Sequence, residues 1–249
     1  MPIKKQKMKK TALITGSTSG IGLAIANNLA ASGYNIIFNG LEANGEQIAA
    51  EVAQKHGIDY LFSPCNLLYT EQIEIMVSQA LAKFGKIDVL VNNAGIQNWM
   101  QISDEDFFER AQEEIAINIL APLHLTNLFL NLPALSTIIN VSSGLSFTPL
   151  TKTPVYSATK AFIHSFTLSL QHLLKANSVE VIEVIPPALN TDLGGKGLHD
   201  TAPPVSDFIT SIFKQIQEGK TTLTFGFSEM MLKAGPEELT QAFNRMNPA

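Results

Sequence analysis

Short apolar runs rich in β-branched residues alternate with longer stretches of helical periodicity along the whole chain. The apolar runs cover residues 11–15, 35–39, 60–63, 89–92, 137–142, 179–185 and 223–225. Helical spacing begins near residues 21, 45, 71, 104, 156 and 206. This alternation is typical of βαβ units, in which parallel strands are buried between helices on both faces of a sheet. The sequence therefore predicts an α/β fold with a doubly wound, mostly parallel sheet of seven strands.

Charge and length limit the classes of protein to which this chain can belong. Its 249 residues carry a net charge of −5, which argues against a nucleic-acid partner. No apolar run reaches the roughly 18 residues of a spanning helix, so no membrane partner is expected. Cys65 is the only cysteine, which fits a cytoplasmic location, and the five histidines lie at no metal-ligand spacing. We expect a flexible lysine-rich tail at residues 1–10 and a single domain over residues 11–249, because no linker-like segment divides them.

A glycine-rich turn follows the first predicted strand and opens the first predicted helix. Glycines at 16, 20 and 22 would let the pyrophosphate of a dinucleotide approach the backbone, and the positive end of the helix favours the anion. By itself the Gly-x3-Gly-x-Gly spacing also fits a purely structural turn, but the strand–turn–helix context favours a Rossmann-type nucleotide site. The residues expected to bind a cofactor here are Gly16, Ser17, Thr18, Ser19, Gly20, Ile21 and Gly22.

Tyr156 and Lys160 are four residues apart, which places them on one face of a predicted helix. Such a pair also arises by chance between surface side chains. A phenol has a pKa near 10, and lowering it to about 7 requires about 4 kcal/mol. One ammonium group at about 4 Å supplies an interaction of that order at an effective dielectric constant near 20. Tyr156 could then act as a general base on an alcohol or a general acid on a carbonyl.

Ser143 and Asn118 are further candidates for the same site. Ser143 ends a predicted strand, where open α/β sheets bind ligands, although a serine at this place is also a common turn residue. Pro122 has no N–H to bond the backbone carbonyl of Asn118. That carbonyl could hold a water molecule that links Lys160 to solvent, or the proline could simply kink the helix.

Taken in order, these motifs resemble the short-chain dehydrogenase/reductase family over residues 11–226. The resemblance implies an NAD(P)-dependent oxidoreductase that transfers a hydride between a nicotinamide and a carbonyl or secondary alcohol. It implies that Ser143, rather than Ser142, belongs to the catalytic set with Tyr156 and Lys160, and that Asn118 is the fourth catalytic residue. The further cofactor contacts that it implies or suggests are Asn39, Asn66, Leu67, Asn93, Ala94, Gly95, Tyr156, Lys160, Pro186 and Thr191.

The residues that would meet the adenosine ribose favour NAD over NADP. A 2′-phosphate requires arginine or lysine nearby, and neither the glycine turn nor the stretch Asn39-Gly-Leu-Glu42 provides one. Glu42 would repel a phosphate. The aspartate typical of NAD-specific relatives is missing at this strand end, so Asn39 or the backbone would hold the ribose hydroxyls. Asn66 could accept a hydrogen bond from the adenine amine.

The resemblance to branches of the family changes along the chain. Residues 11–97 look most like 3-hydroxybutyrate dehydrogenases, and the chain from about residue 106 looks like DltE-type oxidoreductases. Gln97 matches a substrate-binding glutamine of the first branch and joins Ser143 and Tyr156 as an expected substrate contact. Other substrate positions of that branch do not match, because they hold Leu145, Thr153 and Ala188. A small hydroxy-acid substrate is therefore not expected, and the loop at about 186–205 is predicted to cover the substrate.

Two other functions remain open from the sequence, a cofactor-binding regulator on the same fold and a sugar-nucleotide epimerase. Epimerases share the Tyr-x3-Lys pair but usually need a longer chain. Two predicted helices carry apolar residues on more than one face, which predicts burial on both sides and hence a homodimer or homotetramer. These residues are Ile115, Ile119, Leu125 and Phe129 in one helix, and Phe162, Phe166, Leu170 and Leu174 in the other.

Overall fold

The strands form one parallel sheet whose order reverses near its middle. The computed structural model describes residues 9–248, and in it the sheet order is β3-β2-β1-β4-β5-β6-β7. The strands are β1 (Thr11–Ile14), β2 (Asn35–Asn39), β3 (Tyr60–Ser63), β4 (Val89–Asn92), β5 (Thr137–Val141), β6 (Glu180–Ile185) and β7 (Thr222–Thr224). All neighbouring strands are parallel. The predicted doubly wound sheet of seven parallel strands is confirmed.

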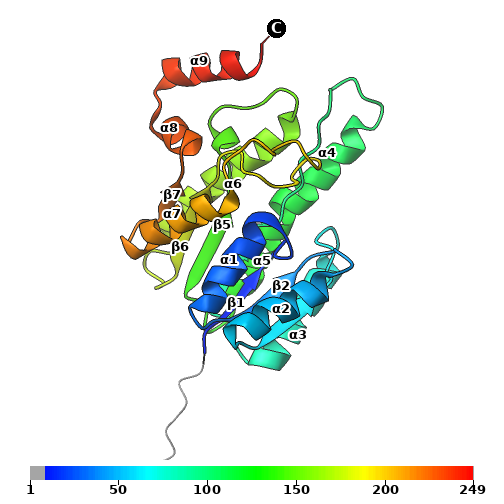
Figure 1. Cartoon of the computed structure of the whole chain (residues 1–249), viewed down its shortest axis with the longest axis vertical. Coiled ribbons are helices and arrows are strands. Elements are labelled where there is room, and N and C mark those ends of the chain that lie inside the picture. Colours follow the sequence, from blue (N-terminus) through cyan, green and yellow to red (C-terminus); the bar gives the residue numbers. More distant parts are fainter. Residues whose placement is uncertain (1–8, 249) are drawn as a thin grey trace, which may run out of the picture.

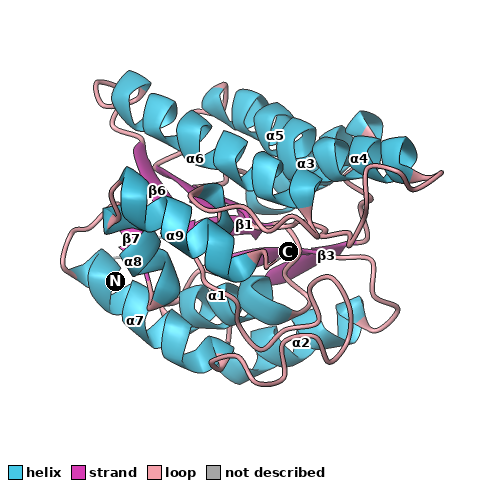
Figure 2. Cartoon of the chain, turned by 90° about the horizontal axis from the view of Figure 1, so that it is seen from above, coloured by secondary structure: helices cyan, strands magenta, loops and turns pink. Residues whose placement is uncertain are grey.

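Helices cover both faces of the sheet (Figures 1 and 2). On one face lie α1 (Gly20–Ala31), α2 (Gly45–His56) and α7 (Val205–Gln217). On the other lie α3 (Thr70–Phe84), α4 (Phe107–Ile115), α5 (Ala121–Leu130) and α6 (Pro154–Leu173). The remaining helices are a 3-10 turn at Gly144–Ser146, α8 (Phe227–Lys233) and α9 (Pro236–Met246).

Alternate residues of the central strand β1 face the two helical layers, as the period of two in a strand requires. Ile14 belongs to a buried cluster with Phe208 of α7, whereas the adjacent Leu13 packs with Phe129 of α5 on the opposite face. All four residues of β1 are buried. Because both faces are buried, the strands are continuous apolar runs, which is why their positions were predictable from the sequence.

Helices α4 and α5 are joined by a π-helical turn at Ala116–Leu120. This turn comes just before Pro122, whose ring nitrogen cannot donate to the helical ladder. Helix α4 begins at Phe107, later than the predicted start near Asp104. The Asp104 carboxylate instead pairs with Arg110 at 2.8 Å and accepts a backbone N–H at 2.8 Å, which keeps this segment in a turn.

The end of the chain returns to the body of the protein above the carboxyl ends of the strands (Figure 2). Ser228 at the start of α8 is fully buried and donates its hydroxyl to the Ile185 carbonyl at 2.5 Å. After α9, the Asn247 amide donates to the Pro149 carbonyl at 3.0 Å, and its oxygen accepts the Thr151 N–H at 2.7 Å. These bonds attach both C-terminal helices to the segments beside the site.

The predicted lysine-rich tail lies mostly outside the described residues, which begin at Lys9. Lys9 donates its ammonium group to the Gly57 carbonyl at 2.8 Å, and the Lys10 carbonyl accepts the Asn35 N–H at 2.8 Å. Within residues 9–248, no helix has the length and apolar character that crossing a membrane requires.

Candidate active site

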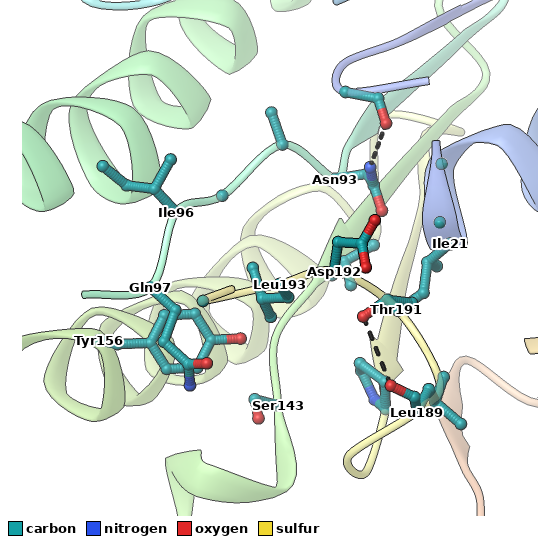
Figure 3. A pocket seen from close by; sticks show the side chains of 18 of the residues that line it. Ile21, Asn93, Ile96, Gln97, Ser143, Tyr156, Leu189, Thr191, Asp192 and Leu193 are labelled. Carbon is teal, nitrogen blue, oxygen red and sulfur yellow. Dashed lines mark hydrogen bonds between the residues drawn. The ribbon is translucent and has the colours of Figure 1, made fainter. Parts of the chain in front are cut away.

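A cavity of about 1430 Å³ opens at the carboxyl ends of the strands, around the point where the order reverses between β1 and β4. Open α/β sheets bind ligands at this point. The wall is built from the turn after β1, the ends of β2, β4 and β5, helix α6, the loop after β6, and the helices α8 and α9. Figure 3 shows side chains from several of these elements around one space.

Most of the predicted site residues line this cavity. They are Gly16, Ser19, Gly20, Ile21, Gly22, Asn39, Asn66, Leu67, Asn93, Ala94, Gly95, Gln97, Ser143, Tyr156, Lys160, Pro186 and Thr191. Ser17 and Thr18 do not line it. Ser17 is fully buried, with its hydroxyl donated to the Ile14 carbonyl at 2.8 Å, and the Thr18 hydroxyl donates to the Glu42 carboxylate. The side chains of Ser17 and Thr18 therefore stabilise the turn rather than face a ligand.

The glycine-rich turn is shaped for close backbone approach. Gly16 has a φ of +60°, which favours glycine, and a Cβ on Gly22 would lie 2.1 Å from the Gly16 carbonyl oxygen. Asn93, at the end of β4, donates its amide to the carbonyls of Thr15 and Gly16 at 2.8 and 3.1 Å. The Asn93 side chain thus fixes the turn on the side that faces β4. The opposite side of the turn lines the cavity beside the N-terminus of α1.

The adenosine end of the cavity differs from the prediction in one respect. The Asn39 side chain is turned inward, where it accepts the Gly16 N–H at 3.3 Å and donates to the carbonyls of Ser63 and Cys65. The carboxylate at the cavity wall is instead Glu42, three residues later, which accepts hydrogen bonds from the hydroxyls of the glycine turn. Of the two predicted ribose contacts at this strand end, the geometry favours the backbone over the Asn39 side chain.

Asn66 lies farther along the same end of the cavity. Its side-chain oxygen accepts the Leu68 N–H at 3.0 Å, and its own N–H donates to Gln72 at 2.7 Å. An amide oxygen has two lone pairs, so Asn66 retains one for a further donor.

Ser143, Tyr156 and Lys160 meet at the opposite end of the cavity. Ser143 follows β5, and the other two side chains lie one turn apart on α6. Lys160 donates to the Val141 carbonyl at 2.9 Å, and its Nζ atom lies 5.6 Å from the centre of the Tyr156 ring. Tyr156 and Ser143 face the same space in Figure 3. The structure therefore brings together the three side chains that the sequence predicted.

Asn118 is buried behind this group and does not line the cavity. It lies within the π-helical turn, and its amide donates to the Ile96 carbonyl at 2.9 Å and the Thr159 hydroxyl at 3.1 Å. Its side-chain oxygen accepts the Ile96 N–H at 2.9 Å. The side chain thus ties the segment after β4 to α6, one residue from Lys160.

Burial controls the proton affinities of Tyr156 and Lys160. It raises the pKa of Tyr156 well above its usual value, against a hydrogen bond from Ser143 that lowers it, and the nearby Glu114 carboxylate raises it further. Burial also lowers the pKa of Lys160 to about 8. Among the protein's own groups, desolvation therefore outweighs the attraction of Lys160, so the expected lowering of the Tyr156 pKa toward 7 does not follow from Lys160 by itself. At neutral pH the phenol is protonated and can donate.

The part of the cavity beyond Ser143 and Tyr156 is mainly apolar. Gln97 lies here, as predicted, but several of its neighbours were not foreseen. The apolar lining residues on this side are Ile96, Trp99, Leu145, Leu150, Leu193, Leu198, Phe227 and Met246. Phe227 and Met246 come from α8 and α9, to which the sequence pattern assigned no role. Only their position after the last strand could have suggested one.

The loop after β6 contacts both halves of the site. The Pro186 carbonyl accepts the Gly144 N–H at 3.0 Å, beside Ser143. Thr191 packs against the glycine turn, since a Cβ on Gly20 would lie 3.5 Å from the Thr191 methyl group. The loop closes on itself where the Asn190 N–H donates to the Pro203 carbonyl at 2.9 Å. Residues 186–204 therefore connect the glycine turn with the end of the cavity that holds Ser143.

A doubly wound sheet with a glycine-rich turn at one end of its cavity and a serine, tyrosine and lysine at the other defines a nucleotide-dependent oxidoreductase. The chain belongs to the short-chain dehydrogenase/reductase family, because the family model for short chain dehydrogenases matches residues 10–201. It is 36% identical over 247 residues to the uncharacterized oxidoreductase DltE of Bacillus subtilis, covering 95% of this chain and 96% of that protein.

A second relative represents the other predicted branch. The D-beta-hydroxybutyrate dehydrogenase of Cupriavidus necator is 43% identical over 165 residues, covering 64% of this chain and 62% of that protein. Solved structures share the fold. A short-chain dehydrogenase from Sphingobium yanoikuyae in complex with NADPH superposes with a TM-score of 0.75 and 23% identity, over 86% and 87% of the two chains. A 3-ketoacyl-(acyl-carrier-protein) reductase from Brucella melitensis complexed with NADH gives 0.75 and 24%, over 89% and 100%.

Replacing Gly22 by alanine tests the glycine turn. The added Cβ would lie 2.1 Å from the Gly16 oxygen and 2.5 Å from the Asn93 amide nitrogen, so the turn must move. We expect the dissociation constant for NADH, measured by fluorescence, to rise by at least about tenfold. Gly235→Ala is the control, because its nearest atom would be 3.9 Å away, and it should bind as the wild type does. A folded Gly22→Ala protein with unchanged affinity would contradict this account of the turn.

Proposed function

We propose that the protein is an NAD-dependent dehydrogenase/reductase that interconverts neutral, largely apolar carbonyl compounds and their secondary alcohols. The observation that carries the proposal is the placement of Ser143, Tyr156 and Lys160 in the same cavity as the glycine-rich turn. The bound nicotinamide would supply or accept the hydride at the carbonyl carbon. The side chains of this protein would bind the substrate oxygen and move its proton.

Each catalytic side chain has a separate task in carbonyl reduction. Ser143 donates its hydroxyl to the substrate oxygen, and Tyr156 transfers its phenolic proton to that oxygen as the hydride reaches the carbon. Lys160 provides the positive charge that stabilises the resulting phenolate. Asn118 lies in the π-helical turn before Pro122, so its backbone carbonyl can hold a water molecule that returns a proton through Lys160. Alcohol oxidation runs these steps in reverse.

The lining of the substrate side supports a neutral substrate. Apart from the catalytic lysine, the charged side chains of the cavity lining are the carboxylates of Glu42 and Asp192. The hydroxybutyrate branch places a lysine at the position of Thr153 and a histidine at that of Leu145. Here Thr153 is fully buried and Leu145 adds apolar surface. Nothing at these two positions would bind a substrate carboxylate.

Turnover of a panel of neutral ketones and aldehydes with NADH tests the proposed reaction. Tyr156→Phe should lower turnover by at least about 100-fold, the usual scale for a lost general acid, while NADH binding is retained. Lys160→Ala should weaken both turnover and NADH binding. Tyr69→Phe, which alters an exposed phenol, is the control and should be silent. A Tyr156→Phe enzyme near the wild-type rate would contradict the mechanism, and an NADH-binding wild type without turnover would indicate a regulator instead.

The choice of NAD over NADP rests on Glu42. The hydroxyls of Thr18 and Ser19 hold this carboxylate at the cavity wall beside the end of β2. A ribose 2′-phosphate would bring close to two negative charges against it, whereas a free hydroxyl could donate a hydrogen bond to it. Structural neighbours of this fold carry either cofactor, so the carboxylate rather than the fold supports NAD.

Dissociation constants for NADH and NADPH at matched ionic strength test this choice. We expect NADH to bind at least about tenfold more tightly, a difference of ~1.4 kcal/mol. Glu42→Gln should narrow the difference by improving NADPH binding, because it removes the repulsion. Glu51→Gln, an exposed glutamate of α2, should leave the ratio unchanged. Tighter binding of NADPH to the wild type would show the assignment to be wrong.

We also propose that the outer face of α4 and α6 forms a two-fold interface. Of the apolar residues that the sequence predicted for an interface, Leu125, Phe129, Leu170 and Leu174 are instead buried in the protein's own core. Ile115 and Phe162 are each 40% exposed, and they lie in the same helical layer (Figure 2). The other exposed apolar residues of this layer are Ile75, Phe108, Leu120, Leu130, Leu168 and Leu173. A second copy of the chain would cover this surface.

Light scattering after gel filtration at micromolar concentration should therefore give a dimer or tetramer. Phe162→Asp should shift the mass toward the monomer, because a charge would be buried at the interface. A wild-type monomer under these conditions would exclude the interface.

A further inference from the structure

Glu114 is a buried carboxyl group that the proposed reaction does not use. It lies on α4, four residues before Asn118, and is 0% exposed. Its Oε1 atom accepts the Asn98 N–H, whereas Oε2 is buried without a partner among residues 9–248. A buried carboxylate with half of its hydrogen-bonding capacity unmet is costly, so its presence beside an active site calls for a functional explanation.

The backbone that Glu114 holds belongs to the substrate side of the cavity. Gln97 and Trp99 flank Asn98, and both line the cavity. Met100, the next residue, donates its N–H to the Lys152 carbonyl at 3.0 Å, just before the start of α6. The segment 96–100 is therefore held by Glu114 from one side and by the entry to α6 from the other.

No cation neutralises Glu114 within the described part of the chain. Arg110, one turn earlier, directs its guanidinium group at Asp104 and Asp106, at 2.8 and 3.0 Å. Burial raises the pKa of Glu114 to about 7, although the Asn98 N–H and the more distant charge of Arg110 lower it. The carboxyl group therefore changes charge within the neutral range of pH.

Among residues 9–248, the charged and titratable groups that act on Glu114, or on which it acts, lie on two helices that pack together, α4 and α6. On α4 they are Arg110 and the exposed Glu113, and on α6 the group is Tyr156. The carboxylate raises the pKa of Tyr156 because a phenolate would be repelled by it. The two groups are thus coupled, and the ionisation of either one disfavours that of the other.

We propose that Glu114 is a positioning residue that holds the substrate segment 96–100 through Asn98 and places a negative charge near Tyr156 across the packed helices α4 and α6. The inference rests on the proposed role of Tyr156. Above pH 7 Glu114 is charged, so Tyr156 stays protonated to a higher pH and reduction continues there. Below pH 7 Glu114 is neutral, and the Asn98 N–H loses a charge-assisted acceptor.

The pH dependence of kcat/KM for alcohol oxidation measures the ionisation of Tyr156 directly. In Glu114→Gln the negative charge is absent, so the rise in kcat/KM should move to lower pH by about 0.5–1 unit. The amide oxygen of the glutamine still accepts the Asn98 N–H, so KM at pH 8 should change by less than about threefold. A purely structural role would change KM or stability without moving this midpoint.

Three further variants separate charge from packing. Glu113→Gln removes an exposed charge next to Glu114 on the same helix and should leave the midpoint unchanged. Glu114→Asp keeps the charge and should restore the wild-type midpoint. Glu114→Ala removes the acceptor as well, so its midpoint should move as in Glu114→Gln while KM rises by about tenfold.

An unshifted midpoint in Glu114→Gln, or an equal shift in Glu113→Gln, would overturn the inference. If circular dichroism shows that Glu114→Gln does not fold, the pH dependence of KM in the wild type decides instead. The inference requires an inflection in this profile near pH 7, and the Glu113→Gln variant should show the same inflection. Failure of the proposed function can be told apart from failure of this inference. If the proposed function is wrong, Tyr156→Phe keeps its turnover or the wild type has none.

Discussion

The buried ammonium group of Lys160 sets the conditions for the rest of the site. The residue is 4% exposed, and its Nζ atom donates to the Val141 carbonyl at 2.9 Å where β5 ends. A Cβ on Gly95 would lie 3.4 Å from this nitrogen and 3.3 Å from the Asn118 side-chain oxygen, so a side chain there would fit only if Asn118 moved by a few tenths of an ångström. A charge can stay buried only in rigid surroundings with fixed acceptors. The closely packed sheet supplies them, because each of its central strands is buried on both faces.

The same burial explains why the Tyr156 phenol keeps its proton at neutral pH. Desolvation pushes the pKa of Tyr156 up and that of Lys160 down, so both groups stay neutral more readily than they would in water. The Glu114 carboxylate adds to the effect on the phenol. The presence of a tyrosine and a lysine on one helical face therefore does not by itself determine their protonation states. Their depth in the protein and the carboxyl group on the neighbouring helix decide which protonation states are present.

The sequence predicted the parts of this protein that depend on local patterns. The buried strands are continuous apolar runs, and the glycine turn and the Tyr156–Lys160 pair have spacings with a direct geometric meaning. What the sequence did not predict depends on tertiary packing. Glu114 and the adjacent Glu113 are indistinguishable in the local sequence. Glu114 is buried because α4 packs against α6 and the segment 96–100, where it accepts the Asn98 N–H. Asn39 likewise ends strand β2 as expected, but its side-chain amide donates to the carbonyls of Ser63 and Cys65 instead of facing the cavity.

Transfer of deuterium from labelled NADH tests the central claim, which is direct hydride transfer to a carbonyl carbon in this cavity. The enzyme would be incubated with a neutral ketone and with NADH carrying deuterium at either the pro-R or the pro-S position of C4, and the alcohol analysed by mass spectrometry. A site that holds the cofactor in one orientation should place deuterium on the carbinol carbon from one labelled form and not from the other. Alcohol formed without deuterium from either form, or NADH binding with no alcohol at all, would contradict the account.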